Sequence, residues 1–163
     1  MDQLLVDGYN VIYGWEELRS LASLEHARHR LIDDLASFQA FTGIRITVVF
    51  DSSQEQPPTS KVDRGVRVIY APPPVDADGV IEALARGLVS QGAEVGVVTS
   101  DRLEGDLAFG MRCLHWTVAR FAEELARARR EMGRWTMEAG PAGRRASLRS
   151  HLGEDGLAWL LED

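Results

Sequence analysis

The chain is poor in cysteine and lysine, and it has no apolar run long enough to cross a membrane. A single cysteine, Cys113, excludes an internal disulfide and a thiolate zinc site, which fits a reducing cytoplasm. A membrane-spanning helix needs roughly 20 consecutive apolar residues, and none occurs. The first residues lead into an apolar run without a preceding basic segment, so we expect no signal peptide and no membrane partner.

Common catalytic motifs are also missing. There is no P-loop, no GxGxxG motif after the first apolar run and no GxSxG motif. The histidines do not cluster, which argues against a histidine-based metal or nucleophile site. DGYN at 7–10 lacks the second aspartate of haloacid-dehalogenase-type phosphatases. The only lysine, Lys61, lies too early for a receiver domain. These missing residues argue against the interpretation of the chain as a phosphatase of similar topology.

Positive charge is scarce. The chain has 18 Lys and Arg residues against 25 Asp and Glu residues, a net charge of −7. This balance argues against broad, unspecific binding of nucleic acid, but it leaves room for a local basic patch.

What the sequence does contain is an alternation of strand and helix patterns. Its 163 residues, 45% of them apolar, suffice for one domain with a sizeable core. Short β-branched runs predict strands at 3–6, 44–50, 66–70, 94–99 and 111–115. Helical spacing predicts helices at 24–40, 76–90 and 118–131, with a helical turn at 102–109 and exposed loops at 8–14 and 52–65. This order favours an α/β fold of three layers, with a mainly parallel central sheet and helices on both faces.

The composition changes after Met132. Gly133, Gly140, Pro141 and Gly143 predict a linker, and Leu157 to Leu161 predict a short C-terminal helix. We therefore expect a folded domain at 1–132, followed by a linker and short helical tail at 133–163.

Three of the apolar runs end in an aspartate: Asp7, Asp51 and Asp101. The carboxyl ends of parallel strands share one edge, where ligands bind. Crowded carboxylates repel one another, and a hard divalent cation such as Mg²⁺ or Mn²⁺ compensates them. One such aspartate is more often a turn or a cap, but three in one α/β pattern predict a metal site.

Two further side chains could join this site. Asp78 stands at the start of a predicted helix, where it either caps the helix or, with Glu82 one turn later, faces the strand ends. Asn10 follows Asp7 by three residues and could orient a carboxylate, bind a metal-held water or simply form a turn.

Basic residues lie near the predicted strand ends. Lys61 and Arg64 belong to the polar segment 52–65, which is either a basic lip or a solvated loop. Arg102 follows Asp101 directly and could hold a phosphate or pair with Glu104.

Four segments together resemble a known family. VDGYNVI at 6–12, VVFD at 48–51, VDADGVIE at 75–82 and VVTSDRLE at 97–104 are similar to the YacP-like branch of the NYN nucleases, over about residues 3–131. The resemblance implies a PIN-like fold and a metal-dependent ribonuclease. At least one member of the branch is an endoribonuclease that acts on mRNA at the ribosome. Two positions depart from the pattern, with Asp76 in place of an expected Thr and Gly79 in place of an expected Ser.

By this motif the resemblance places Asp7, Asp78 and Asp101 in the acidic site, with Asn10 and Asp51 beside it. We therefore predict an endoribonuclease that acts on RNA with Mg²⁺ or Mn²⁺ and engages the ribosome. The expected catalytic residues are Asp7, Asn10, Asp78 and Asp101; the metal ligands are Asp7, Asp51, Asp78 and Asp101; and the substrate-binding residues are Lys61, Arg64 and Arg102. The alternative is an RNA- or ribosome-binding module with weak or lost catalysis. The net acidity favours it, and the intact aspartates argue against it.

Overall fold

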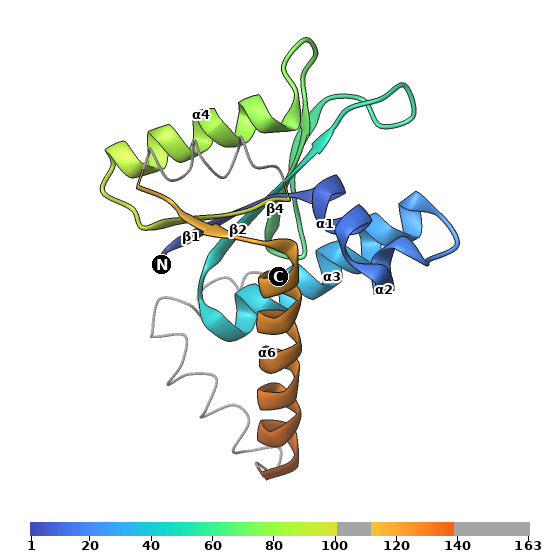
Figure 1. Ribbon diagram of the computed structural model, residues 1–163, viewed down its shortest axis with the longest axis vertical. Helices are drawn as coiled ribbons and strands as arrows, with labels where there is room; N and C mark the ends of the chain where they lie inside the picture. Colours follow the sequence, from blue (N-terminus) through green and yellow to red (C-terminus); the bar gives the residue numbers. More distant parts are fainter. Residues whose placement is uncertain (101–111, 139–163) are drawn as a thin grey trace, which may run out of the picture.

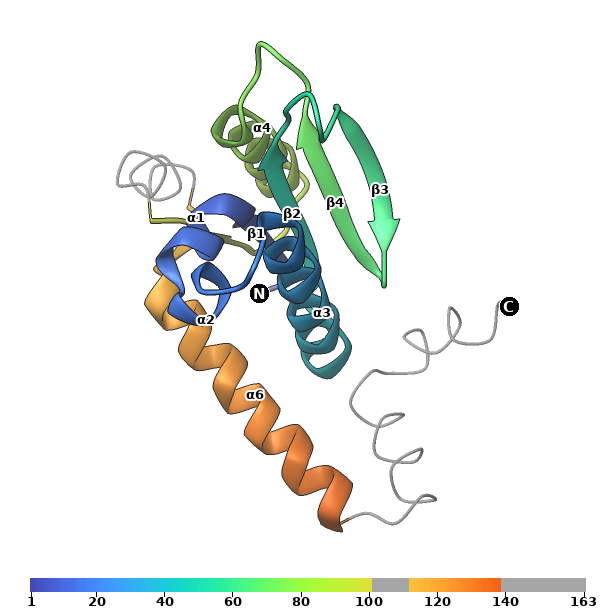
Figure 2. The same ribbon diagram turned by 90° about the vertical axis from the view of Figure 1, so that its right-hand side faces the viewer.

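The computed structural model describes residues 1–100 and 112–138. Within them, six strands form one sheet in the order β3-β4-β2-β1-β5-β6. The strands are β1 (Gln3–Asp7), β2 (Arg45–Asp51), β3 (Thr59–Asp63), β4 (Val66–Ala71), β5 (Val95–Val98) and β6 (Leu114–Trp116). All neighbours pair in parallel except β3 with β4, which form an antiparallel hairpin at one edge (Figures 1 and 2).

Helices cover both faces of this sheet. The helix α4 (Ala77–Ser90) packs on one face, while the helices α1 (Gly8–Gly14), α2 (Glu16–Arg19), α3 (Leu24–Thr42) and α6 (Val118–Glu138) lie on the other (Figure 1). The predicted α/β fold with three layers and a mainly parallel sheet is therefore confirmed.

Two apolar cores explain why the strand patterns are so uniformly hydrophobic. Side chains alternate along a strand, so Leu4 and Val6 of β1 enter the core beneath α3, while Leu5 enters the core beneath α4. Five consecutive residues of β2 are buried in the same way. A strand covered on both faces needs apolar residues at every position, which is the pattern of a parallel sheet.

The ends of α3 follow the expected signals. Ser23 caps its first turn by accepting a hydrogen bond from the backbone N–H of His26 at 3.1 Å. Gly43 ends it in the left-handed region, with φ of 73°. Helix α3 thus runs two residues beyond the predicted 24–40 and stops where the Thr42-Gly43 pair indicates.

Two segments predicted as loops are regular structure. Residues 8–14 form α1, because Asp7 caps the helix directly at the end of β1. Residues 59–63 form β3, whose side chains are almost all exposed. An edge strand can be held by the backbone hydrogen bonds of a single neighbour, so it needs no apolar pattern, and the sequence gives no periodic signal for it. The turn predicted at 102–109 lies outside the described residues.

The last helix is longer than predicted. Phe121, Leu125 and Ala128 face the core, and α6 continues through Gly133 to Glu138. It therefore crosses the boundary predicted after residue 132, and the extent of the domain stays a prediction. None of the helices that the structure describes is long and apolar enough to cross a membrane.

Candidate acidic site at the carboxyl edge of the sheet

Asp7 ends β1 and at the same time caps α1. Its Oδ1 accepts a hydrogen bond from the backbone N–H of Asn10 at 3.3 Å, and its Oδ2 accepts one from Asn10 Nδ2 at 2.5 Å. Only 4% of Asp7 is exposed to solvent. The strand and the helix together therefore hold a buried carboxylate at the carboxyl edge of the sheet.

Asp78, in the first turn of α4, lies beside Asp7. Burial raises the pKa of Asp7 from 3.8 to about 6, and the negative charge of Asp78 and its side-chain hydrogen bonding with Asp7 act in the same direction. The two hydrogen bonds from Asn10 oppose the shift without cancelling it. The structure thus brings together Asp7, Asn10 and Asp78, three of the four predicted catalytic residues.

Asn10 links this pair to the next strand. While its amide nitrogen donates to Asp7, its Oδ1 accepts a hydrogen bond from the hydroxyl of Ser100, two residues beyond the end of β5. Asn10 is therefore held from both sides. We did not predict a role for Ser100, although its place directly before Asp101 in the TSD triplet was a signal that could have suggested one.

Asp51 fastens the helix that carries Asp78. Its Oδ1 accepts a hydrogen bond from the backbone N–H of Ala77 at 2.8 Å, while Asp76 caps the same helix through the N–H of Gly79 at 2.9 Å. Asp51 thus ties the end of β2 to the first turn of α4. Its predicted role as a metal ligand stays a prediction.

Gly8 lets the strand-to-helix turn sit close to the core. A Cβ atom at this position would lie 2.2 Å from a ring carbon of Phe50, a fully buried side chain. A side chain at position 8 would therefore push apart the turn that positions Asp7 and Asn10. This close approach explains the glycine in the DGYN motif.

The carboxylates suit a divalent cation. Asp7 and Asp78 present hard oxygen donors, and their mutual repulsion in a buried setting is what a bound cation would relieve. Among the described residues, no group of three acidic, histidine or cysteine side chains is placed to hold a metal ion. Asp101 and Arg102, predicted as a ligand and a substrate contact, lie outside the described residues.

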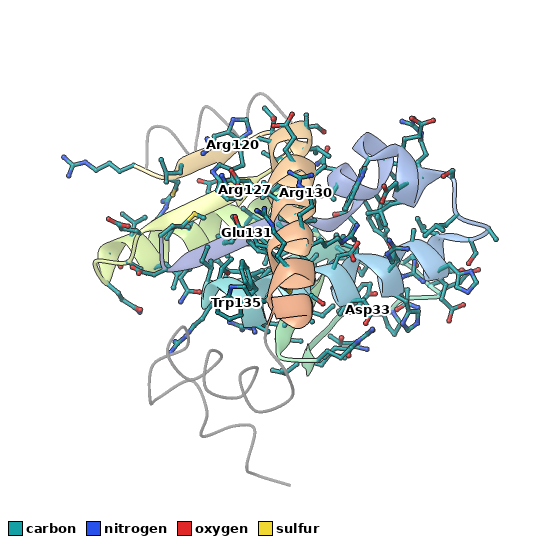
Figure 3. The ribbon with its side chains drawn as sticks, turned by 90° about the horizontal axis from the view of Figure 1, so that it is seen from below. Asp33, Arg120, Arg127, Arg130, Glu131 and Trp135 are labelled. Atoms are coloured by element: carbon teal, nitrogen blue, oxygen red, sulfur yellow. The ribbon has the colours of Figure 1, made fainter. Side chains whose placement is uncertain are left out.

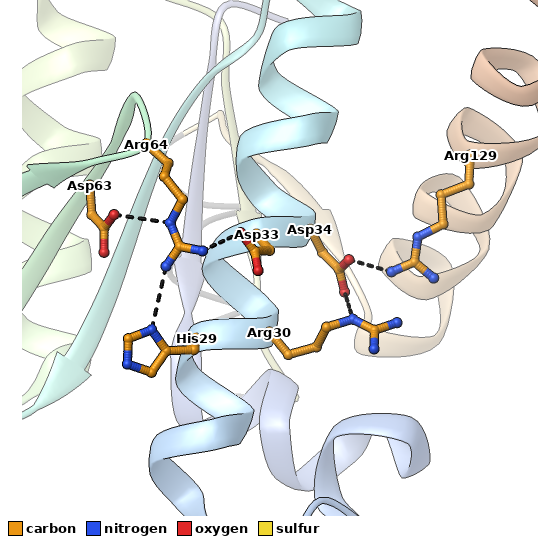
Figure 4. A network of polar contacts seen from close by, with 7 residues as sticks. All are labelled: His29, Arg30, Asp33, Asp34, Asp63, Arg64 and Arg129. Carbon is orange, nitrogen blue, oxygen red and sulfur yellow. Dashed lines mark hydrogen bonds and ion pairs between the residues drawn. The ribbon is translucent and has the colours of Figure 1, made fainter. Parts of the chain in front are cut away.

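The predicted location of Arg64 was wrong. Asp63 pairs with Val66, the first residue of β4, so the hairpin that carries Arg64 lies at the amino end of β4, whereas the carboxylates lie at the carboxyl ends of the strands. Arg64 contacts Asp63 at 3.0 Å and also binds Asp33 of α3 (Figure 4). Arg64 follows Asp51 closely in the sequence, but β3 runs antiparallel to β4 and carries the chain away from the site before the turn at Arg64. Lys61 is exposed on β3, between these two ends.

Comparison with known proteins agrees with this geometry. A family model for the YacP-like NYN domain matches residues 4–160. The chain belongs to the YacP-like NYN domain family. It is 37% identical, over 137 residues, to the protein YacP of Bacillus subtilis (strain 168), and the match covers 82% of this chain and 81% of that protein.

Two solved structures share the fold of this NYN domain. A crystal structure of a mutant of Rae1 (YacP) from Bacillus subtilis has a TM-score of 0.74 and 33% identity, covering 96% of this chain and 91% of that one. A second crystal structure of Rae1 has a TM-score of 0.73 and 31% identity, covering 98% and 92%.

The NYN family match also extends the resemblance beyond the segments that first indicated it. It continues to residue 160, beyond the range of about 3–131 that the sequence motifs indicate. Because NYN domains are nuclease-like, the match identifies a nuclease-type hydrolase fold, and such domains generally use divalent metals.

Proposed function

We propose that this protein is an endoribonuclease that hydrolyses RNA phosphodiester bonds with Mg²⁺ or Mn²⁺. The observation that carries the proposal is the buried Asp7 carboxylate beside Asp78, at the sheet edge of a nuclease-like domain. A neutral residue such as asparagine could also accept the backbone hydrogen bond at position 7. An ionisable carboxylate in this buried position therefore indicates a functional role rather than a structural one.

In this proposal, Asp7 and Asp78 hold the cation through their carboxylate oxygens, with Asp101 as the third acidic group. The bound metal would activate water and stabilise charge on the scissile phosphate. Asn10 fixes the orientation of Asp7 through the hydrogen bond from its amide nitrogen, and Ser100 fixes Asn10 in turn. Asp51 holds the first turn of α4, which carries Asp78, in register with the sheet edge.

We further propose that the substrate is mRNA engaged at the ribosome, with Arg102 among the contacts. The net charge of −7 supports a partner, because an acidic protein repels free RNA at long range. The same acidity favours the second candidate, an RNA- or ribosome-binding module that has lost catalysis. The preserved pair of Asp7 and Asp78 argues against such a loss.

A cleavage assay with the purified full chain tests the proposal. Structured and unstructured RNA would be incubated with Mn²⁺, with Mg²⁺ or with EDTA, using wild type, Asp7→Asn and Asp78→Asn. Glu123→Gln, an exposed carboxylate on α6, is the matched control. We expect internal cleavage that needs metal and falls at least about 100-fold in both aspartate variants but not in the control.

Cleavage in EDTA, or full activity of Asp7→Asn, would contradict the metal-dependent mechanism. RNA binding without cleavage under every metal condition would instead favour the binding module. Thermal denaturation of each variant shows whether a loss of activity reflects unfolding.

A further inference from the structure

A row of aromatic rings leads from the core to the surface next to the acidic site. The ring of Phe50 lies 5.3 Å from that of Tyr70 and 5.0 Å from that of Tyr9, and Tyr9 lies 6.2 Å from Tyr13. Tyr13, at the outer end, is 58% exposed. Both Tyr9 and Tyr13 belong to α1, the helix that begins at Asp7. An exposed aromatic ring thus lies within one short helix of the carboxylates.

A half-buried arginine accompanies this row. Arg28 of α3 donates a hydrogen bond from Nη1 to the phenol oxygen of Tyr9 at 3.3 Å. Burial raises the pKa of Tyr70, and the positive charge of Arg28 partly offsets that rise, so the guanidinium lies near both phenols. Among the described residues, Arg28 forms no ion pair with a carboxylate. Its remaining N–H donors are therefore free to bind an anion.

Lys61 extends the positive charge across the edge of the sheet. It pairs with Val68, so Tyr70 is its diagonal neighbour on the face that α3 covers. The nearby carboxylate of Asp63 is compensated by Arg64 at 3.0 Å. Lys61 itself is exposed and has no ion pair within the described part of the chain.

We propose that Tyr13, Tyr9, Arg28 and Lys61 form a track for single-stranded RNA that leads from the acidic site across α1 and α3 to β3. Bases stack on the exposed ring of Tyr13, and phosphates bind Arg28 and Lys61. Stacking tolerates any base, and a guanidinium matches the oxygens of a phosphate. This proposal rests on the proposed function, because the track would guide the RNA substrate to the same acidic site.

The outer face of α6 is a weaker competitor for RNA. Figure 3 shows Arg120, Arg127 and Arg130 along this helix together with Glu131. Arg120 lies 4.9 Å from the ring centre of Trp116, and Arg127 binds Glu124 at 2.5 Å. Acidic residues are thus interspersed with the arginines, and the face carries little surplus positive charge.

RNA binding by the full chain tests the track without requiring cleavage. The anisotropy of a fluorescein-labelled oligouridylate would be measured in EDTA over a series of salt concentrations. Tyr13→Ala should weaken binding about tenfold, because it removes the stacking of one base. Tyr13→Trp should retain wild-type affinity, because any aromatic ring can stack on a base. Leu114→Ala, which trims another exposed apolar side chain, is the matched control and should bind as wild type does.

The cations are tested through the salt dependence. Lys61→Ala and Arg28→Gln should each make the slope of log K against log salt shallower by about 0.7, the value for one phosphate contact on a single strand. Arg45→Ala, an exposed arginine at the start of β2, should leave the slope unchanged. If Arg28→Gln unfolds, the exposed positions Lys61 and Tyr13 decide the outcome.

Equal affinity of Tyr13→Ala and Leu114→Ala, with unchanged slopes for the cation variants, would overturn the track and leave this face open to a protein partner. If wild type nevertheless cleaves RNA in the separate assay with Mn²⁺ or Mg²⁺, the proposed nuclease function stands. The reverse result, binding through the track without cleavage, would keep the track and reject the nuclease.

Discussion

Asp7 serves the fold and the site at once. As the cap of α1 it needs only an oxygen that accepts the N–H of Asn10, and an asparagine offers one as well. The hydrogen bonds from Asn10 favour the negative charge, but burial and the neighbouring charge of Asp78 outweigh them, so the charge is unfavourable on balance. The charge therefore lowers the stability of the metal-free protein.

This conflict predicts how stability depends on pH. The pKa of Asp7 is about 6 in the folded protein against 3.8 as the ordinary value, so the folded state binds the proton more tightly. The contribution of Asp7 to the free energy of unfolding then decreases as pH rises from about 4 to 6, and stays low above that range. In EDTA, Asp7→Asn should be more stable than wild type by about 3 kcal/mol near pH 8, and by much less near pH 4.

Urea denaturation at both pH values measures the difference. Glu123→Gln, at an exposed position, should follow the wild-type profile. An Asp7→Asn protein that is less stable than wild type at both pH values would show that the charge supports the fold.

At the residue scale, the sequence predicted the location of a site residue correctly where that residue ends a strand. Topology put Asp7 at the carboxyl edge of the sheet but left Asp78 as either a helix cap or a site residue, and the family resemblance placed the two together. Ser100 was missed, because its place before Asp101 in the TSD triplet indicates a position near the site but not the hydrogen bond to Asn10. Arg64 was misplaced, because a hairpin inside a polar segment reverses direction without an apolar signal.

Helix α4 is the element on which the site depends most. Two carboxylates hold its first turn: Asp76 from within, through Gly79, and Asp51 from the end of β2, through Ala77. Both also suit the positive end of the helix dipole. A shift of this turn would move Asp78 away from Asp7.

Substitutions at Asp51 separate a tether from a metal ligand. Asp51→Ala removes the 2.8 Å bond to Ala77 and should lower the free energy of unfolding by about 1–2 kcal/mol. Asp51→Asn keeps an acceptor, so it should restore most of that stability. If Asp51 acts only as a tether, Asn should also restore Mn²⁺ affinity, measured by calorimetry.

Asp76→Ala is the comparison variant, because it removes the other cap of the same helix. Loss of Mn²⁺ affinity in a stable Asp51→Asn protein would assign Asp51 to the metal instead.

The elements themselves were predicted most accurately where burial dictates the pattern. Buried parallel strands such as β2 must be apolar throughout, and α3 carries both a cap and a stop signal. The short helix α1 and the edge strand β3 lack such constraints. The cap formed by Asp7 stabilises α1, and the backbone hydrogen bonds of β4 stabilise β3. Hydrophobic periodicity along the sequence shows neither of these interactions.

At the scale of the whole molecule, a charged cluster joins the two long helices on one face. Asp34 of α3 accepts a hydrogen bond from Arg129 of α6 and lies 3.4 Å from Arg30 (Figure 4). Arg129 also reaches Glu17 of α2 at 3.9 Å. Because the side chain of Asp34 is only 10% exposed, its charge depends on these partners.

Arg129→Ala should therefore destabilise the protein by about 2 kcal/mol, since it leaves a buried carboxylate with Arg30 alone. Adding Asp34→Asn should recover part of that loss, and urea denaturation of the two single variants and the double variant measures the coupling. Arg127→Ala, which breaks an exposed pair with Glu124, should cost less than about 1 kcal/mol. Equal effects of Arg129→Ala and Arg127→Ala would mean that apolar packing alone joins α6 to α3.

The polar strand β3 has a consequence for how copies of the protein meet. A sheet with an open edge can recruit a strand from another molecule and grow into an aggregate. Here one outer strand, β3, has polar residues at three of its four exposed positions, Thr59, Ser60 and Lys61, while the other outer strand in the described part of the chain, β6, is three residues long. A lysine on an edge strand disfavours the addition of another strand, and β6 offers few backbone groups to bind. Strand addition is therefore disfavoured at both outer strands of the described sheet, which lowers the tendency of copies of the protein to join edge to edge.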